Sequence, residues 1–186
     1  MASYVISLGL DCSAVIEKGL PNLEHNARPL QFGLVADQPG DSEAVATPYG
    51  FDNRDTVIFR IFDITPQESA SRLQSIDSLT VDLLAPTTGR LSDDNPFTPA
   101  TNPFIIHGSE LAGPVSREST YFMGAYPAYD SDPYVLVNDS MEPISVLFQA
   151  VLTVMLTDTT GVVPNVKFGV DPEMVVGPSG GRRYKR

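Results

Sequence analysis

Apolar and polar residues alternate with a period of two over a long stretch near the C-terminal end of the chain. Every second residue from Ile144 to Leu156 is apolar, whereas the residues between them are mixed. This pattern is typical of a β-strand with one face in a core and the other partly in water. Residues 158–161 supply a tight turn in which Gly161 can take a positive φ, and 162–170 carries the chain back. The sequence therefore predicts a long β-hairpin.

The second face of this hairpin is unusually apolar for a surface in water. Leu147, Val151 and Met155 lie on it, with polar residues between them. We expect either a second layer of the same chain or another copy of the protein to cover that face.

Shorter stretches of the same kind occur throughout the chain, separated by turn-forming residues. We expect further strands at 3–10, 27–36, 56–64, 79–84, 104–107, 121–125 and 134–137. The stretch 56–64 is apolar on both faces, which predicts a central position in its sheet. Helical character is confined to about one turn at 12–19, capped by Asp11, and to 66–78, which is either a helical turn or a loop.

Sixteen prolines and fourteen glycines are spread along the chain and leave little room for long helices. The main irregular stretches are a polar loop at 37–50 and a proline-rich loop at 85–103, where the prolines exclude a helix and disfavour a central strand. About seven or eight short strands with close turn signals predict an all-β fold. We expect an immunoglobulin-like β-sandwich, with a jelly roll as the alternative.

The charge is strongly acidic and unevenly distributed, with a formal net charge of −11. Four of the twelve basic residues lie at the C-terminal end, namely Arg182, Arg183, Lys185 and Arg186. The sequence predicts one acidic domain at 1–177 and a flexible basic tail at 178–186. The tail has three interpretations: contact with the acidic surface of a neighbouring copy, weak attachment to nucleic acid, or a disordered end. The acidic domain itself disfavours nucleic acid and anionic membranes as partners.

Three features of the sequence favour a cytoplasmic protein. Residues 1–20 lack a basic start and Asp11 interrupts their apolar run, so we expect no secretory signal. No window of about 18 apolar residues predicts a membrane span. The single cysteine, Cys12, excludes an intramolecular disulfide and fits a reducing compartment.

The residue types needed for catalysis occur, but without a recognisable motif. Cys12 could pair only with His25 or His107, and its apolar neighbourhood favours a packed thiol over a reactive one. The sequence has no phosphate-binding loop or zinc-binding spacing, and the glycines at 177–181 are interpreted as part of a linker. We therefore expect a protein that is not an enzyme.

Two short acidic clusters are candidates for binding Ca²⁺ through carboxylate oxygens. They contain Asp93 and Asp94 in one loop, and Asp130 and Asp132 in another. Neither cluster matches a twelve-residue calcium-binding loop, and acidic residues are common in solvated turns. We expect no cofactor.

Aromatic residues gather between 121 and 134. Tyr126, Tyr129 and Tyr134 each offer a large amphipathic surface that suits contacts with protein or sugar. The alternative is that these rings fill the end of the sandwich.

Three stretches resemble the PixA/AidA family of bacterial inclusion-body proteins. SYVISLGLDCSAVIEKGLPN has the strand, acidic residue, short helical segment and proline of that family, with Asp11 and Pro21. RDTVIFRIFDIT resembles its middle strand, and FQAVLTVMLTDTTGVVPNVKFGVDPEMVV resembles its final hairpin, with Asp171 followed by Pro172. The resemblance implies an immunoglobulin-like sandwich, cytoplasmic inclusions or crystals, and no established catalytic residues.

Together these features predict a non-enzymatic structural protein whose main partner is itself, in an ordered assembly or an intracellular inclusion. One alternative is a β-sandwich module that binds sugar or protein through the tyrosine-rich region. Another is a surface component of a virion or phage, with the basic tail meeting nucleic acid.

Overall fold

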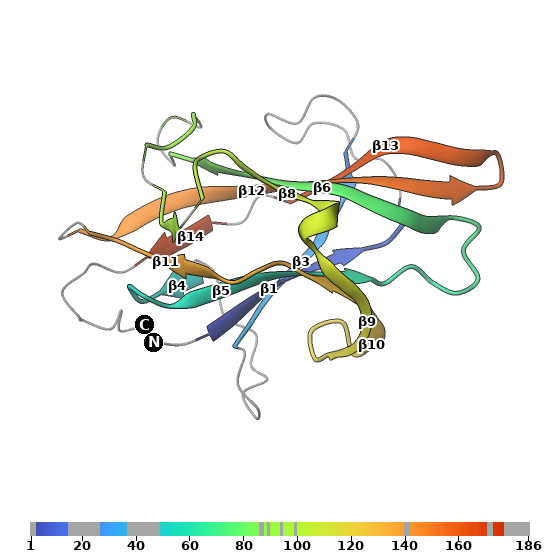
Figure 1. The fold of residues 1–186 in the computed structure, drawn as a ribbon, viewed down its shortest axis with the longest axis horizontal. Coiled ribbons are helices and arrows are strands. Elements are labelled where there is room, and N and C mark those ends of the chain that lie inside the picture. Colours follow the sequence, from blue (N-terminus) through green and yellow to red (C-terminus); the bar gives the residue numbers. More distant parts are fainter. Residues whose placement is uncertain are drawn as a thin grey trace.

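The computed structural model describes residues 3–14, 27–36, 49–85, 88, 90–93, 95–98, 100–139, 142–170 and 173–176. These residues form two β-sheets packed face to face, with one 3-10 turn at Gly108–Glu110 (Figure 1). The expected all-β sandwich is confirmed. The described residues form fourteen strands, more than the sequence predicts, because each sheet is extended by strands of only two to four residues.

The first sheet is organised around β5. Its strands are β1 (Ser3–Leu10), β3 (Gln31–Ala36), β5 (Thr56–Asp63), β7 (Phe97–Thr98), β9 (Ala112–Ser119), β10 (Gly124–Asp130) and β11 (Tyr134–Leu136). One side of β5 pairs in parallel with β1, which pairs in turn with β3. The other side is shared by β11, which continues to β7, and by β10, which continues to β9. The predicted central position of β5 is therefore confirmed.

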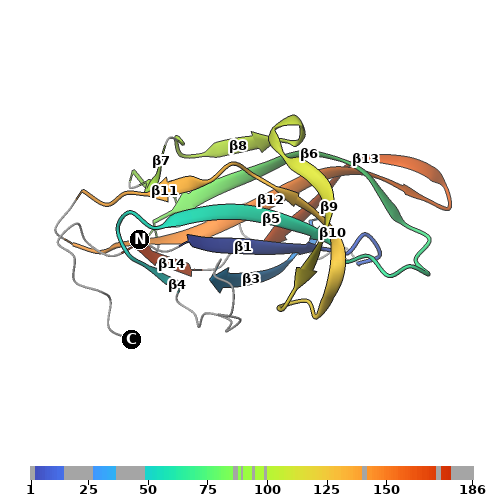
Figure 2. The same ribbon diagram turned by 60° about the horizontal axis from the view of Figure 1, so that its bottom comes forward.

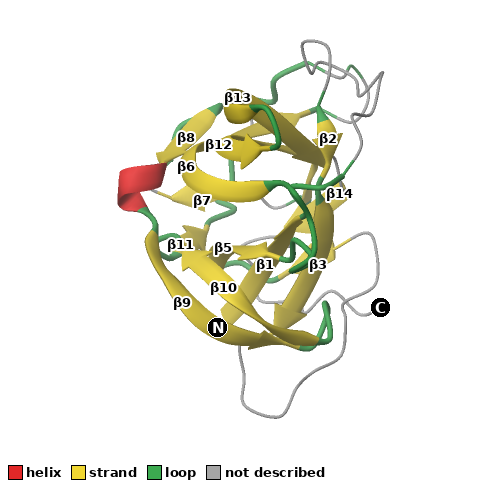
Figure 3. Cartoon of the chain, turned by 90° about the vertical axis from the view of Figure 1, so that its right-hand side faces the viewer, coloured by secondary structure: helices red, strands yellow, loops and turns green. Residues whose placement is uncertain are grey.

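The second sheet has the same plan around β12. Its strands are β2 (Arg28–Pro29), β4 (Tyr49–Phe51), β6 (Arg72–Leu84), β8 (Phe104–His107), β12 (Ile144–Asp158), β13 (Gly161–Val170) and β14 (Glu173–Val176). One side of β12 pairs with β6, which continues to β8. Its other side is shared by β13 and β14, which continue to β2 and β4. Figure 3 shows the two sheets as separate layers.

The long hairpin predicted from the alternating pattern is confirmed as β12 and β13, and Gly161 has a φ of 122°. The inward face of β12 is buried from Val146 to Leu156. On its outward face Val151 is 9% exposed, and Leu147 and Met155 are part-buried. This cover exists within a single copy, so the apolar outward face does not require a second one.

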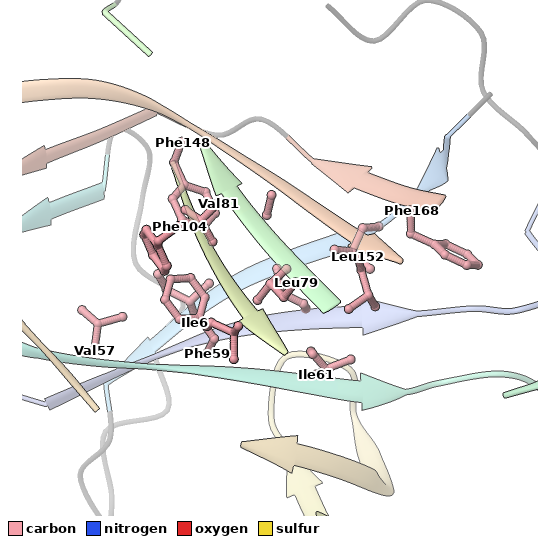
Figure 4. Packing of buried hydrophobic residues seen from close by; sticks show 14 of the residues in the cluster. Ile6, Val57, Phe59, Ile61, Leu79, Val81, Phe104, Phe148, Leu152 and Phe168 are labelled. Carbon is pink, nitrogen blue, oxygen red and sulfur yellow. The ribbon is translucent and has the colours of Figure 1, made fainter. Parts of the chain in front are cut away.

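The core lies between the two sheets, where the inward residues of β1 and β5 meet those of β6 and β12 (Figure 4). Phe59 of β5 stacks on Phe148 of β12, with ring centroids 5.7 Å apart and planes inclined by 10°. Further rings surround this pair, namely Phe97, Phe104 and Tyr134. Each buried side chain of this size contributes about 1.5–3 kcal/mol to folding, which makes this aromatic cluster a main tie between the layers.

The proline-rich loop is held by hydrogen bonds from asparagine side chains to the main chain, rather than by pairing between strands. The Asn102 amide donates to the carbonyl oxygens of Leu83 and Ser92 at 2.9 and 2.7 Å, and its oxygen accepts from the Leu83 N–H at 3.0 Å. Asn95 accepts from the N–H of Phe97, whose ring is 1% exposed. The stretch 85–103 is therefore more than a surface loop, because it contributes Phe97 to the core.

Three predictions of local structure are wrong in part. Of the stretch 66–78, expected to be a helical turn or a loop, residues 66–71 form the loop, but the polar residues from Arg72 onward form the first half of β6, held by pairing with β12. The single strand expected at 27–36 divides at Leu30, with β2 in the second sheet and β3 in the first. The strand expected at 121–125 is instead the turn and first residues of a hairpin, β9–β10.

Two further predictions lie wholly or mostly outside the described residues. Of the helical turn expected at 12–19, only residues 12–14 are described, and the Asp11 carboxylate accepts from the Ser13 N–H at 2.9 Å. The polar loop expected at 37–50 is described only from Tyr49, which begins β4.

Candidate functional site

The hairpin of β9 and β10 leaves the sandwich as a curved arm, which we define as residues 112–130 (Figure 2). Seven of the eight residues of β9 are exposed, and β9 pairs only with β10 among the described strands. The arm joins the first sheet through three residue pairs, between Ala128–Asp130 of β10 and Arg60–Phe62 of β5. Most of its surface therefore faces water on both sides.

Local hydrogen bonds shape the tip of the arm. The Phe122 N–H donates to the Ser119 hydroxyl at 3.0 Å, and the Tyr126 hydroxyl donates to the Phe122 carbonyl at 3.1 Å. Met123 completes the turn with a φ of 53°. These contacts hold the main chain of Phe122 from both strands of the arm.

Phe122 folds back onto the outer face of the first sheet. A Cβ atom placed on Gly9 of β1 would lie 2.7 Å from the Phe122 ring and 3.0 Å from Ile64 Cδ1. The ring also meets Phe62 edge-on, with centroids 5.5 Å apart. We call the group formed by Gly9, Phe62 and Ile64 the socket. The absence of a side chain at Gly9 is what lets the ring approach this closely.

An ion-pair cluster lies at the base of the arm. Arg60 Nε and a terminal nitrogen of Arg60 donate to the two oxygens of Asp130 at 2.6 and 3.0 Å, and Arg117 Nη2 lies 2.9 Å from Asp130 Oδ2. Arg117 pairs across the arm with Tyr126, four residues before Asp130. The Arg117 side chain therefore runs along the arm towards its base, which helps to hold the arm curved over the sheet.

The acidic candidates do not come together. The Asp130 carboxylate is engaged by the two guanidinium groups, and Asp93 and Asp132 are exposed in separate segments. Asp94 lies outside the described residues. Within the described part of the chain, no group of three or more His, Cys, Asp or Glu side chains is placed to hold a metal ion.

The tyrosines separate into two groups. Tyr129 and Tyr134 pack against the core, and burial raises the pKa of both phenols, with nearby acidic groups adding to the rise. Tyr126 is part-buried on the arm, and Tyr121 at the tip is 42% exposed. Among these candidates for binding, Tyr126 therefore lies on a surface. Tyr129 and Tyr134 instead pack against the core, as expected if the rings fill the sandwich.

The candidate nucleophile is buried. Cys12 has no exposed surface, and burial raises the pKa of its thiol to about 11, with the neighbouring Asp63 and Asp11 adding to the rise. His107 is exposed at the end of β8 in the other sheet. His25 and the basic tail residues Arg182, Arg183, Lys185 and Arg186 lie outside the described residues.

Comparison with known proteins adds no relative: no family model and no curated protein matches the chain. The described part of the chain also contains no helix long and apolar enough to cross a membrane.

The arm is the feature that sequence patterns miss. Its first strand, AGPVSRES, shows no alternation because both of its faces lie in water. Pro114 and Pro127 also suggest a loop. The sequence does contain a weaker signal. An aromatic residue, Phe122, lies in a turn-forming stretch, and a glycine, Gly9, interrupts the apolar strand β1 that it contacts.

Proposed function

We propose that this protein is a non-catalytic structural protein that associates with further copies of itself through the arm. The observation that carries the proposal is the exposure of apolar side chains on a hairpin that leaves the sandwich. Val115 is 52% exposed, Tyr121 42% and Met123 88%. Val115 lies opposite Ala128 where the arm joins the sheet, and Tyr121 and Met123 lie in the turn at its tip. Apolar side chains exposed on an element that projects from the fold suit contacts with another protein surface.

The form of the assembly follows from the resemblance and the charge. The resemblance to the PixA/AidA family supports an ordered intracellular inclusion as the product. A virion or phage surface layer is the alternative assembly, in which the basic tail would meet nucleic acid. Copurifying nucleic acid distinguishes the second from the first.

Sedimentation velocity over a range of protein concentration tests self-association. We expect a species larger than one chain, which Met123→Ser at the tip of the arm weakens. Val162→Ser is the matched control, because Val162 is 61% exposed on the β12–β13 hairpin, away from the arm. A single chain at every concentration contradicts the proposal, and so does equal weakening by the two substitutions.

A second candidate function is binding of a sugar or peptide by the same arm. It is favoured by one observation: Tyr126 and Arg117 are direct neighbours across the arm, and Arg117 reaches Asp130. An aromatic ring beside charged groups suits ligands with both apolar faces and hydroxyl or amide groups. A glycan array with wild type and Tyr126→Ala tests this function, and no binding by either protein removes the sugar.

A further inference from the structure

We propose that the arm opens and closes as a unit over the outer face of the first sheet, and that Phe122 in the socket holds it closed. The inference concerns a single copy and holds whether or not copies associate. Figure 3 shows the closed position, in which β9 and β10 lie below the first sheet, on the side away from the second sheet. Closure covers the Phe122 ring and the socket with each other, and opening presents both apolar surfaces.

The base of the arm has the features of a hinge. Among the described residues, only Ala128, Tyr129 and Asp130 tie the second strand of the arm to β5. The β9–β10 register shifts between Ala128 and Asp130, and a shift of this kind bends a hairpin. Gly113 lies opposite this shift with a φ of 139°, and a Cβ atom there would lie 2.5 Å from the Ala128 carbonyl oxygen. Hinges are formed by a few such residues at the end of an element, so the arm turns here while its anchor stays paired.

Most contacts of the arm move with it. The pairing of β9 among the described strands is with β10 alone, which belongs to the same arm. The hydrogen bonds from the Phe122 N–H to Ser119 and from the Tyr126 hydroxyl to Phe122 also lie within the arm. Opening therefore keeps these contacts. It separates the Phe122 ring from the socket and Arg117 from the base.

Release of Arg117 leaves no buried charge without a partner. The Asp130 side chain is 14% exposed, and it keeps its two hydrogen bonds to Arg60 at 2.6 and 3.0 Å when Arg117 departs. The Arg117 side chain is already 42% exposed, so water replaces its contact with Asp130 at small cost. Salt screens an ion pair of this kind. Phe122 is therefore the main contact that holds the arm closed, and rising salt shifts the arm towards the open position.

The distance between two spin labels, measured by pulsed electron paramagnetic resonance, reports the position of the arm. Met123→Cys at the tip and Val162→Cys on the β12–β13 hairpin place the labels at residues that are 88% and 61% exposed, and the buried Cys12 stays unlabelled. Labelled chains are diluted with unlabelled chains, so that only distances within one copy contribute. We expect one main distance at low salt and a second population that grows as salt rises to about 500 mM.

Two substitutions remove the contact that holds the arm from opposite sides. Phe122→Ala removes the ring, and Gly9→Ala blocks the socket with a Cβ atom 2.7 Å from the ring position. Each should raise the ratio of open to closed arms about tenfold or more, because the packing of one aromatic ring is lost. Ile105→Ala is the matched control at an exposed residue of β8 in the other sheet, and it should leave the distances unchanged.

Circular dichroism on the same samples separates opening of the arm from unfolding. Unchanged distances in folded Phe122→Ala overturn the inference. A second distance that appears only when the dichroism of the whole domain is lost also overturns it, because the arm would then open only by global unfolding. Arg117→Gln should raise the open fraction at low salt and remove most of its salt dependence. Salt dependence equal to that of the parent chain would show that Arg117 does not hold the arm.

Discussion

Cys12 lies fully buried just beyond the end of β1, where burial raises the pKa of its thiol from 9.0 to about 11. The thiolate is the reactive form of cysteine, and a buried neutral thiol presents very little of it near pH 8. We expect Cys12 to react with a disulfide reagent at pH 8 at least about a hundredfold more slowly in the folded protein than in urea. Comparable rates in the two states would contradict the buried position.

The same thiol makes the fold sensitive to alkali. Between pH 9 and 11 the unfolded chain loses the Cys12 proton while the folded chain keeps it, so the free energy of unfolding falls as pH rises through this window. A difference of about two pKa units corresponds to roughly 2–3 kcal/mol. Tyr129 and Tyr134, whose pKa values are also raised, act in the same direction.

Urea unfolding at pH 8 and pH 10.5 separates these contributions. The loss of stability between the two pH values should be smaller in Cys12→Ala than in the wild type, and Tyr129 and Tyr134 contribute to the part that persists. An equal loss in both proteins would show that Cys12 does not titrate in this way.

Asp82 is a carboxylate whose position in the fold disfavours its charged form. It lies on the outer face of β6, opposite Gln149, and burial raises the pKa of its carboxyl group. Its charged form is therefore disfavoured in the folded state, which costs stability above the raised pKa and not below pH 3.8. We expect Asp82→Asn to raise the free energy of unfolding at pH 7 by about a few tenths of a kcal/mol.

Chemical denaturation at pH 7 checks the Asp82 prediction. Asp77→Asn is the control on the same strand, because Asp77 is exposed and should show no gain. Destabilisation by Asp82→Asn would mean that the carboxylate makes a favourable contact that the amide cannot replace.

A strand could be predicted from the sequence where its own residues form an apolar face. The β12 strand could be predicted because its inward residues are all apolar and its turn ends in Gly161. The polar first half of β6 could not, because Arg72 and its neighbours are strand only through pairing with β12. The arm could not be predicted for a related reason. Both faces of β9 are exposed, so its sequence lacks the alternation of apolar and polar residues by which a strand is recognised.

The candidate site was predictable only in part. The cluster of tyrosines overlaps the region that forms the arm, but sequence spacing could not show that Tyr126 lies on a surface while Tyr129 packs against the core. The key glycine of the socket is separated from Phe122 by more than one hundred residues. Contacts at that separation follow from sheet topology, which the sequence pattern left open between two kinds of sandwich.

The proline-rich loop offers an element-scale prediction. Asn102 makes three hydrogen bonds to the main chain of Leu83 and Ser92 and so replaces a strand at the end of β6. Asn102→Ala should lower the free energy of unfolding by about 2–4 kcal/mol, because it removes these bonds and leaves main-chain groups without them. Thr101→Ala, at the exposed neighbour, should change it by less than about 0.5 kcal/mol.

Thermal or urea unfolding measures both substitutions. Hydrogen exchange at the Leu83 amide adds a local readout, since this N–H donates to Asn102. Equal and small effects of the two substitutions would contradict the role of Asn102 in ordering the loop.

The whole molecule is a strongly acidic body with a basic end. Its formal net charge is −11, and four of its twelve basic residues fall in the last five positions, Arg182–Arg186. Like charge opposes the approach of two copies, and a cationic segment on each copy offsets part of that repulsion. Association should therefore depend on salt in opposite ways with and without this segment.

Deletion of 178–186 tests this balance. In the full chain, rising salt screens attraction between the basic residues and the acidic body of a neighbour, so association weakens from about 20 to 500 mM salt. In the shortened chain only repulsion is left to screen, so association is weaker at low salt and strengthens as salt rises. Light scattering and sedimentation over this range measure both proteins. Identical salt dependence would show that the basic residues take no part, and the arms alone would then have to hold the copies together.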